Sequence, residues 1–131
     1  MILNDVLDGL AAAVDTITGL RTYAYPADQV APPAAVVGLP DSPFDIDMGG
    51  SNEWSVPIFV VVGKVSDRAS RTALCAYVTP TGATSIKSAI EADKTLGGAC
   101  DSVAVTRAEF TTISVAGTEY LGAELTCSVV G

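Results

Sequence analysis

Histidine is absent from this 131-residue chain. The absence removes the side chain that most often serves as a general base, the imidazole of a Ser-His-Asp nucleophile system and the usual nitrogen ligand of zinc. Carboxylate pairs could also move protons, but Asp5 with Asp8 and Asp45 with Asp47 have no recognisable nucleophile beside them. We therefore predict that the chain is not an enzyme and has no catalytic residue.

Cysteine is sparse as well. Cys75, Cys100 and Cys127 are odd in number, widely spaced and form no Cys-x-x-Cys pair. Such cysteines neither build a disulfide framework nor supply a thiolate zinc site. We expect free thiols in a reducing compartment, and we expect no metal centre. Cys127 alternates with polar neighbours, which predicts a small buried apolar side chain.

Charged side chains are few, at 17% against roughly 25% in an average soluble protein. The 15 acidic residues outnumber the 7 basic ones, which leaves a net charge of −8. A nucleic-acid reader built on basic patches is excluded by this balance. A surface so poor in charge favours a protein that is partly covered by partner chains.

Long hydrophobic stretches are also missing. The longest apolar run, Val56–Gly63, is far too short to span a bilayer. The N-terminal residues Met1–Asp5 lack the basic start of a signal peptide. We therefore expect a soluble protein made inside the cell, with no membrane partner.

The remaining pattern predicts one α+β domain over residues 1–131. Apolar residues from Leu3 to Ile17 recur at three- and four-residue spacing and predict an N-terminal helix, in which Gly9 permits close approach of another element. Two further helices are expected from Ser66 and from Ser85, each with that serine as N-cap. Strands are expected at residues 20–25, 34–39, 52–63, 102–110 and 121–129.

This order of elements predicts a mostly antiparallel sheet of about four to five strands. The N-terminal helix and the two middle helices should flank it on one face. The last strand alternates strictly between apolar and polar residues, so one of its faces should be buried. Pro57 lies within the longest strand and predicts a bulge or an edge position there.

Motifs that could hold a ligand are incomplete. The stretch Asp45-Ile-Asp47-Met-Gly49 resembles the start of a calcium loop but lacks the third ligand and the glutamate at the twelfth position. Two Gly-Gly pairs, at 49–50 and 97–98, lack the Lys-Ser/Thr of a phosphate-binding loop and predict turns. We therefore expect no metal and no cofactor.

Large apolar side chains near the middle of the chain are candidates for an interface. Trp54 is expected in the core. Aromatic residues and methionine are enriched at protein interfaces, so the large apolar residues of this region other than Trp54 are candidate contact residues. The candidate interface residues are Tyr23, Tyr25, Phe44, Ile46 and Met48.

Five segments carry a resemblance to a known family. They are Thr18–Tyr23 (TGLRTY), Pro32–Pro40 (PPAAVVGLP), Val56–Gly63 (VPIFVVVG) with Ser66-Asp-Arg68, Ser85–Ile90 (SIKSAI) leading to Thr95–Gly98 (TLGG), and Tyr120–Leu125 (YLGAEL). Together, over nearly the whole chain, they resemble the tail terminator (tail completion) proteins of long-tailed bacteriophages, particularly those of actinobacterial hosts.

The resemblance implies a structural role in the virion. In that family a sheet flanked by helices forms a subunit, and six copies close into a ring. The ring caps the head-proximal end of the tail tube, ends tube polymerisation and joins the tail to the head-to-tail connector protein. The implied partners are therefore other copies of the chain, the tail tube protein and the connector, with assembly in the host cytoplasm. DNA passes through the lumen without specific binding, and no cofactor or catalytic residue is implied.

A closed ring of this kind needs two different contact patches on each subunit, which agrees with the low charge. We hypothesise that some acidic residues face the lumen and repel DNA, although they could equally keep the free subunit soluble. The candidate lumen residues are Asp41, Asp45, Asp47 and Glu53.

Two other functions stay open. The first is another ring protein of the neck or tail, such as a connector, a stopper or a tail tube subunit, and a tube subunit would form filaments. The second is a small cytosolic ligand-binding or enzymatic domain, which would be monomeric and would bind a small molecule.

Overall fold

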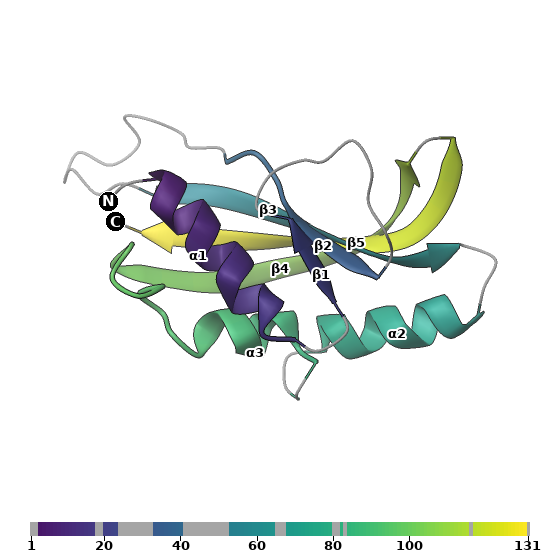
Figure 1. The fold of residues 1–131 in the computed structure, drawn as a ribbon, viewed down its shortest axis with the longest axis horizontal. Helices are drawn as coiled ribbons and strands as arrows, with labels where there is room; N and C mark the ends of the chain where they lie inside the picture. The colour runs from purple at the N-terminus through teal and green to yellow at the C-terminus, as the bar shows by residue number, and fades with distance from the viewer. Residues whose placement is uncertain are drawn as a thin grey trace.

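The computed structural model describes residues 3–17, 20–23, 33–40, 53–64, 68–79, 82, 84–115 and 117–130. Within these ranges the chain forms three helices and five strands (Figure 1). In chain order they are α1 (Leu3–Asp15), β1 (Arg21–Tyr23), β2 (Ala34–Val37), β3 (Glu53–Lys64), α2 (Arg68–Val78), α3 (Ile86–Glu91), β4 (Ser102–Val115) and β5 (Thr118–Val130).

The five strands form one sheet in the order β1-β2-β3-β5-β4. The β1–β2 pair is parallel, and the other three pairs are antiparallel. The predicted α+β class with a mostly antiparallel sheet is therefore confirmed, and the sheet is mixed because of the short edge strand β1.

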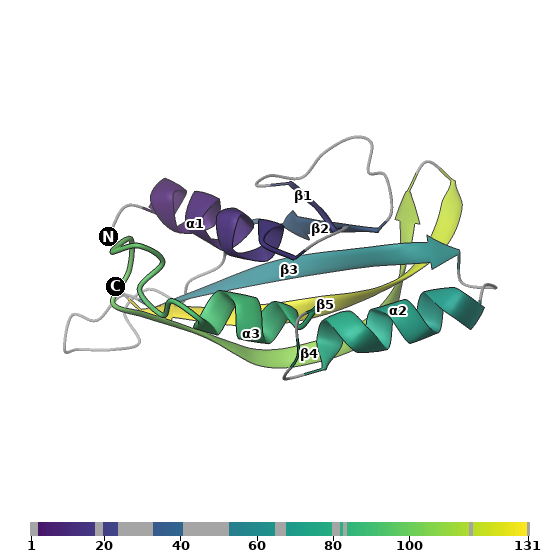
Figure 2. The ribbon, with the colours of Figure 1, turned by 60° about the horizontal axis from the view of Figure 1, so that its bottom comes forward.

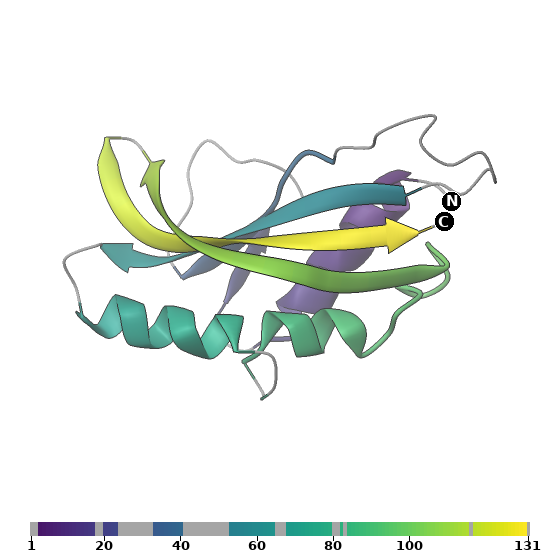
Figure 3. The same cartoon turned by 180° about the vertical axis from the view of Figure 1, so that it is seen from behind.

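All three helices pack against the same face of the sheet. Figure 2 shows α1 above the strands at one end of the sheet and α2 and α3 along the β4 side. Figure 3 looks at the molecule from the opposite side to Figure 1, and there the strands β3, β5 and β4 lie between the viewer and α1. One hydrophobic cluster joins these helices to the inward positions of the strands. Its fully buried members include Val6, Leu10, Val14, Leu74, Ile86 and Ile90 from the helices and Val56, Ile58, Val60, Leu125 and Val129 from the strands.

Hydrophobic spacing explains this one-sided core. Val6, Leu10 and Val14 are four residues apart and 0% exposed, because that spacing stacks side chains on one face of a helix. In β5 the odd-numbered residues from Ala123 to Val129 are buried and the even-numbered residues from Glu124 to Val130 are half-buried, as the alternation predicts. Burial of each Val, Leu or Ile stabilises the fold by roughly 1.5–3 kcal/mol.

The boundaries of the last two strands differ from the prediction. Strand β4 continues to Val115, and strand β5 already begins at Thr118. The two strands form a hairpin that turns through Gly117, whose φ is +81°. The additional residues are mostly exposed on both faces. Hydrophobic alternation gives no signal for such a segment, so sequence periodicity stops at the edge of the core.

Pro57 ends the pairing between β2 and β3. The N–H of Gly38 donates to the carbonyl of Pro57 at 2.7 Å, but proline has no N–H to return the bond, so the ladder stops at Val37 opposite Ile58. The predicted edge position is confirmed for this half of β3. The bulge in β3 lies elsewhere, between Val61 and Gly63.

Gly9 and Gly122 are among the glycines at which two elements approach each other closely. A Cβ atom on Gly9 would lie 3.1 Å from the Cβ atom of Leu96, so α1 approaches the loop after α3 closely, as its sequence predicts. Gly122 in β5 is tighter. Its added Cβ atom would fall within van der Waals overlap of the Val60 carbonyl oxygen and the Ile113 side chain.

We predict that Gly122→Ala destabilises the protein by about 1–3 kcal/mol, because the backbone oxygen of Val60 can move only with its strand. Thr126→Ala, on the same face of the same strand, is the control and should change the free energy of unfolding by less than about 0.5 kcal/mol. Urea unfolding of both variants measures the difference. Equal stability of the two variants would contradict the close packing at Gly122.

Candidate functional site: the outer sheet face and the hairpin arm

No described helix packs on the second face of the sheet, which we call the outer face. Strand register places its side chains in rows that run across the strands. One row contains Tyr23, Val36, Phe59, Glu124 and Glu109 in neighbouring strands from β1 to β4. The row is apolar over β1, β2 and β3 and acidic over β5 and β4.

An apolar groove lies over β2 and β3 on this face. It has a volume of about 350 Å³. The residues that line it are Val36, Gly38, Leu39, Pro57 and Phe59. Leu39 is 74% exposed, so its side chain stands at the surface rather than in the core. A Cβ atom on Gly38 would lie 2.8 Å from the ring of Pro57 and 2.9 Å from that of Phe59, so only glycine fits at this point of the groove.

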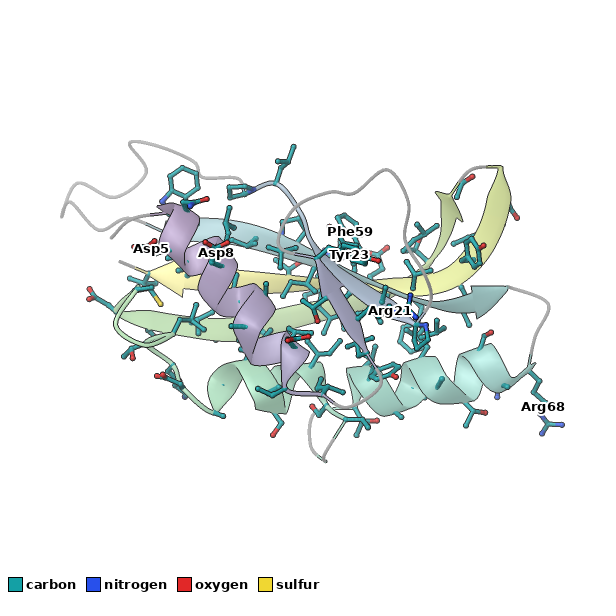
Figure 4. The ribbon with its side chains drawn as sticks, viewed as in Figure 1. Asp5, Asp8, Arg21, Tyr23, Phe59 and Arg68 are labelled. Carbon is teal, nitrogen blue, oxygen red and sulfur yellow. The ribbon has the colours of Figure 1, made fainter. Side chains whose placement is uncertain are left out.

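Tyr23 extends the apolar area to the edge of the sheet. Its neighbour in the row, Val36, is 8% exposed between the cross-strand positions of Tyr23 and Phe59. Figure 4 shows Tyr23 and Phe59 close together, with Arg21 farther along β1. Tyr23 is half-buried and lies outside the core cluster, which keeps it a candidate contact residue.

The other half of the outer face carries carboxylates. Glu109 and Glu124 stand directly opposite each other in β4 and β5, an arrangement of like charges that is unfavourable by itself. The guanidinium of Arg107 lies 3.0 Å from the carboxylate of Glu109 and offsets part of this repulsion. Nearer the chain end, Ser128 Oγ donates to Glu53 Oε1 at 3.0 Å.

Beyond the helices, β4 and β5 continue as an exposed hairpin arm, which we define as residues 107–115 and 117–122. The arm curves away from α2 in Figures 1 and 2. Phe110 is 49% exposed on the arm. It pairs with Ala123, whose side chain belongs to the core, so Phe110 projects on the helix side of the sheet. Among the described residues, the exposed large apolar side chains are Phe110 and Leu39.

The outer edge of β4 is closed at one position by a charged clamp. Lys87 Nζ donates to the carbonyl of Val105 at 3.1 Å, and the carboxylate of Glu91 accepts from the N–H of Val105 at 3.1 Å. Lys87 and Glu91 also pair with each other along α3. The clamp precedes a bulge between Val105 and Arg107, and both features are typical of an edge protected against further strand pairing.

The clamp predicts a pH dependence of stability. The hydrogen bond from Lys87, and then that from the Val105 N–H, hold the pKa of Glu91 below its ordinary value of 4.5, against the effect of burial. A lowered folded-state pKa gives stability that is present above the unfolded value and lost as the pH falls through the folded value. Glu91→Gln should cost about 1 kcal/mol at neutral pH and flatten the decline below about pH 5.

Thermal unfolding across this pH range, with Asp8→Asn on the exposed side of α1 as a control, measures the effect. The control should follow the wild-type profile. An unchanged profile in Glu91→Gln would mean that the clamp does not contribute to stability.

Three of the residues that the sequence predicts for the interface, the lumen or the aromatic core lie within the described part of the chain. Tyr23 lies on the outer face, and Glu53 is exposed there on β3. Trp54 is half-buried and packs against the core cluster, which agrees with its predicted position. The other candidates lie outside the described residues: Tyr25, Phe44, Ile46 and Met48 for the interface, and Asp41, Asp45 and Asp47 for the lumen.

Sequence reasoning missed most of this surface. Phe59 lies in the apolar run Val56–Gly63, which gives no sign of its direction, yet its neighbours Ile58 and Val60 point inward, so Phe59 must point outward. That parity was available from the sequence once the buried face was known. Leu39 and Phe110 carried no signal, because nothing in the sequence marked either position as lying outside the core.

The described residues show no cluster suited to metal binding. No three of their cysteine and acidic side chains come together as a potential metal site. Burial raises the pKa of the Cys127 thiol to about 12, so it is not a reactive thiolate. No helix in the described part of the chain is long and apolar enough to cross a membrane.

Comparison with known proteins gives no family for the chain. No protein-family model matches it, and no curated protein matches it significantly.

Proposed function

We propose that this chain is a structural subunit of a bacteriophage tail, in which a ring of copies caps the head-proximal end of the tail tube. The ring ends tube polymerisation and joins the tail to the head-to-tail connector protein. Assembly takes place in the host cytoplasm, and the finished ring is part of the virion. The starting point of the proposal is the sequence resemblance to tail terminator proteins.

The structural observation that supports this role is a pair of different exposed apolar surfaces on one chain. The groove with Leu39 lies over β2 and β3 on the outer face, whereas Phe110 lies on the hairpin arm and on the helix side. A closed ring of identical subunits needs two unlike patches that bind each other head to tail. A free monomer gains nothing from exposing both.

The charge distribution supports passive passage of DNA. Glu53, Glu109 and Glu124 lie on the outer face of β3, β4 and β5, and the whole chain carries a net charge of −8. Repeated around a ring, carboxylates that line a lumen repel phosphate groups and keep DNA from adhering. Glu53 is the member of the predicted acidic set that the described residues include.

A second candidate function is suggested by the same groove. Its volume of about 350 Å³ falls within the range of pockets that hold small ligands, and its lining is apolar. A monomer that binds a small apolar molecule is therefore the alternative to a ring subunit.

We predict that the purified protein forms closed rings at high concentration or on isolated tail tubes. Light scattering behind size exclusion, over a concentration series, should give one discrete oligomer mass. Negative-stain images should then show rings that bind one end of a tail tube and do not stack on themselves.

Other outcomes would point elsewhere. Open filaments of the purified protein would identify a tail tube subunit instead. A protein that stays monomeric, ignores tail tubes and binds a small apolar ligand would contradict the structural role.

A further inference from the structure

We propose that Phe110 of one copy inserts into the apolar groove of the next copy, so that the hairpin arm is the contact that closes the ring. This inference rests on the proposed ring function and specifies its interface. It involves no partner other than a second copy of this chain.

The first argument is that, within the part of the chain that the structure describes, Phe110 and the groove cannot contact each other. Phe110 projects on the helix side from the edge strand β4, while the groove opens on the opposite face over β2 and β3. Strand β5 lies between β4 and β3 in the sheet. The ring of Phe110 therefore cannot reach its own groove, and a contact between the two requires a second copy.

The second argument is size and chemistry. A cavity of about 150 Å³ lined by apolar side chains already holds a benzene ring. The groove has a volume of about 350 Å³, which is room enough for an aromatic ring. Its lining of Val36, Leu39, Pro57 and Phe59 offers apolar and ring-edge contacts, which are the contacts that a phenylalanine side chain prefers.

The third argument is charge. Arg21 is exposed on the same face of the sheet as Tyr23 and Phe59, two residues along β1 from the row that contains Phe59. Glu119 is exposed on the arm, opposite Ser114, on the same side as Phe110. Neither side chain forms an ion pair with another described residue, and both are exposed.

The distance from Glu119 to Phe110 on the arm is similar to the distance from Arg21 to Phe59 in the groove. From strand spacing and rise per residue, Glu119 lies about 14 Å from Phe110, and Arg21 lies about 12 Å from Phe59 in the groove. When Phe110 occupies the groove, Glu119 of one copy can therefore approach Arg21 of the other. This complementarity favours a second copy over a neutral small ligand as the occupant.

The first test is a set of side-chain replacements at the proposed contact. Phe110→Ser and Leu39→Ser should each weaken subunit association by about tenfold to a hundredfold. Phe110→Leu keeps an apolar side chain and should weaken it by much less. Circular dichroism of each variant checks that the monomer remains folded, and sedimentation equilibrium measures the association.

Exchanging the two charges between Arg21 and Glu119 gives a second test, whose outcome does not depend on the folding stability of a single variant. Arg21→Glu and Glu119→Arg should each weaken association by about threefold to tenfold, since each places like charges together. The double variant should restore it to near the wild-type value. Failure of the double variant to recover, with both single variants folded, would contradict the proposed pairing of these charges.

Disulfide trapping detects directly whether position 110 of one copy contacts position 39 of another. In a Cys75→Ser background, a variant with Phe110→Cys is mixed with one carrying Leu39→Cys and is oxidised mildly. The inference predicts a cross-linked heterodimer between the two variants. Absence of that product at concentrations where the wild-type protein associates would overturn the inference. A wild-type protein that does not associate at any concentration would overturn it as well.

The two proposals fail in different ways. Rings that form without the 110–39 cross-link, and that tolerate Phe110→Ser, would leave the ring function standing and refute this interface. A 110–39 cross-link in open filaments would support the interface and refute the capping function.

Discussion

Three helices bury a single face of the five-stranded sheet, and the remaining features of the molecule depend on this one-sided packing. The core forms where α1, α2 and α3 meet the inward residues of β3 and β5, such as Ile58 and Leu125. Because the helices use only that face, the same strands present a second set of side chains on the outer face. The strand parity that buries Ile58 and Val60 therefore also places Phe59 outside the core.

The sheet also extends beyond its core. Strands β4 and β5 continue past the helices as the hairpin arm, where Phe110 is half-exposed. The Lys87–Glu91 clamp on Val105 and the bulge beside it mark the point at which the edge of the core ends and the arm begins. A chain with an exposed apolar groove, a protruding arm and few charges has the features that head-to-tail assembly requires.

The sequence was sufficient for the parts of the fold that depend on periodicity. The four-residue spacing of Val6, Leu10 and Val14 and the alternation in β5 predicted the right elements and the right buried faces. Ser85 was recognised as a helix cap, and its hydroxyl accepts from the N–H of Ser88 at 3.1 Å. The candidate site was harder, because its residues become neighbours only through strand register. Tyr23, Val36 and Phe59 are far apart in sequence, and the exposed residues of the arm carry no hydrophobic pattern that could reveal a strand.

The central claim is that copies of this chain meet through the outer face and the arm rather than through their helices. Electron cryomicroscopy of the protein assembled on isolated tail tubes tests it most directly. The account predicts a closed ring in which the arm of each subunit lies over β2 and β3 of the next, with α1, α2 and α3 outside the contact. A ring in which helices of adjacent subunits pack together, while Phe110 and Leu39 both face solvent, would contradict it.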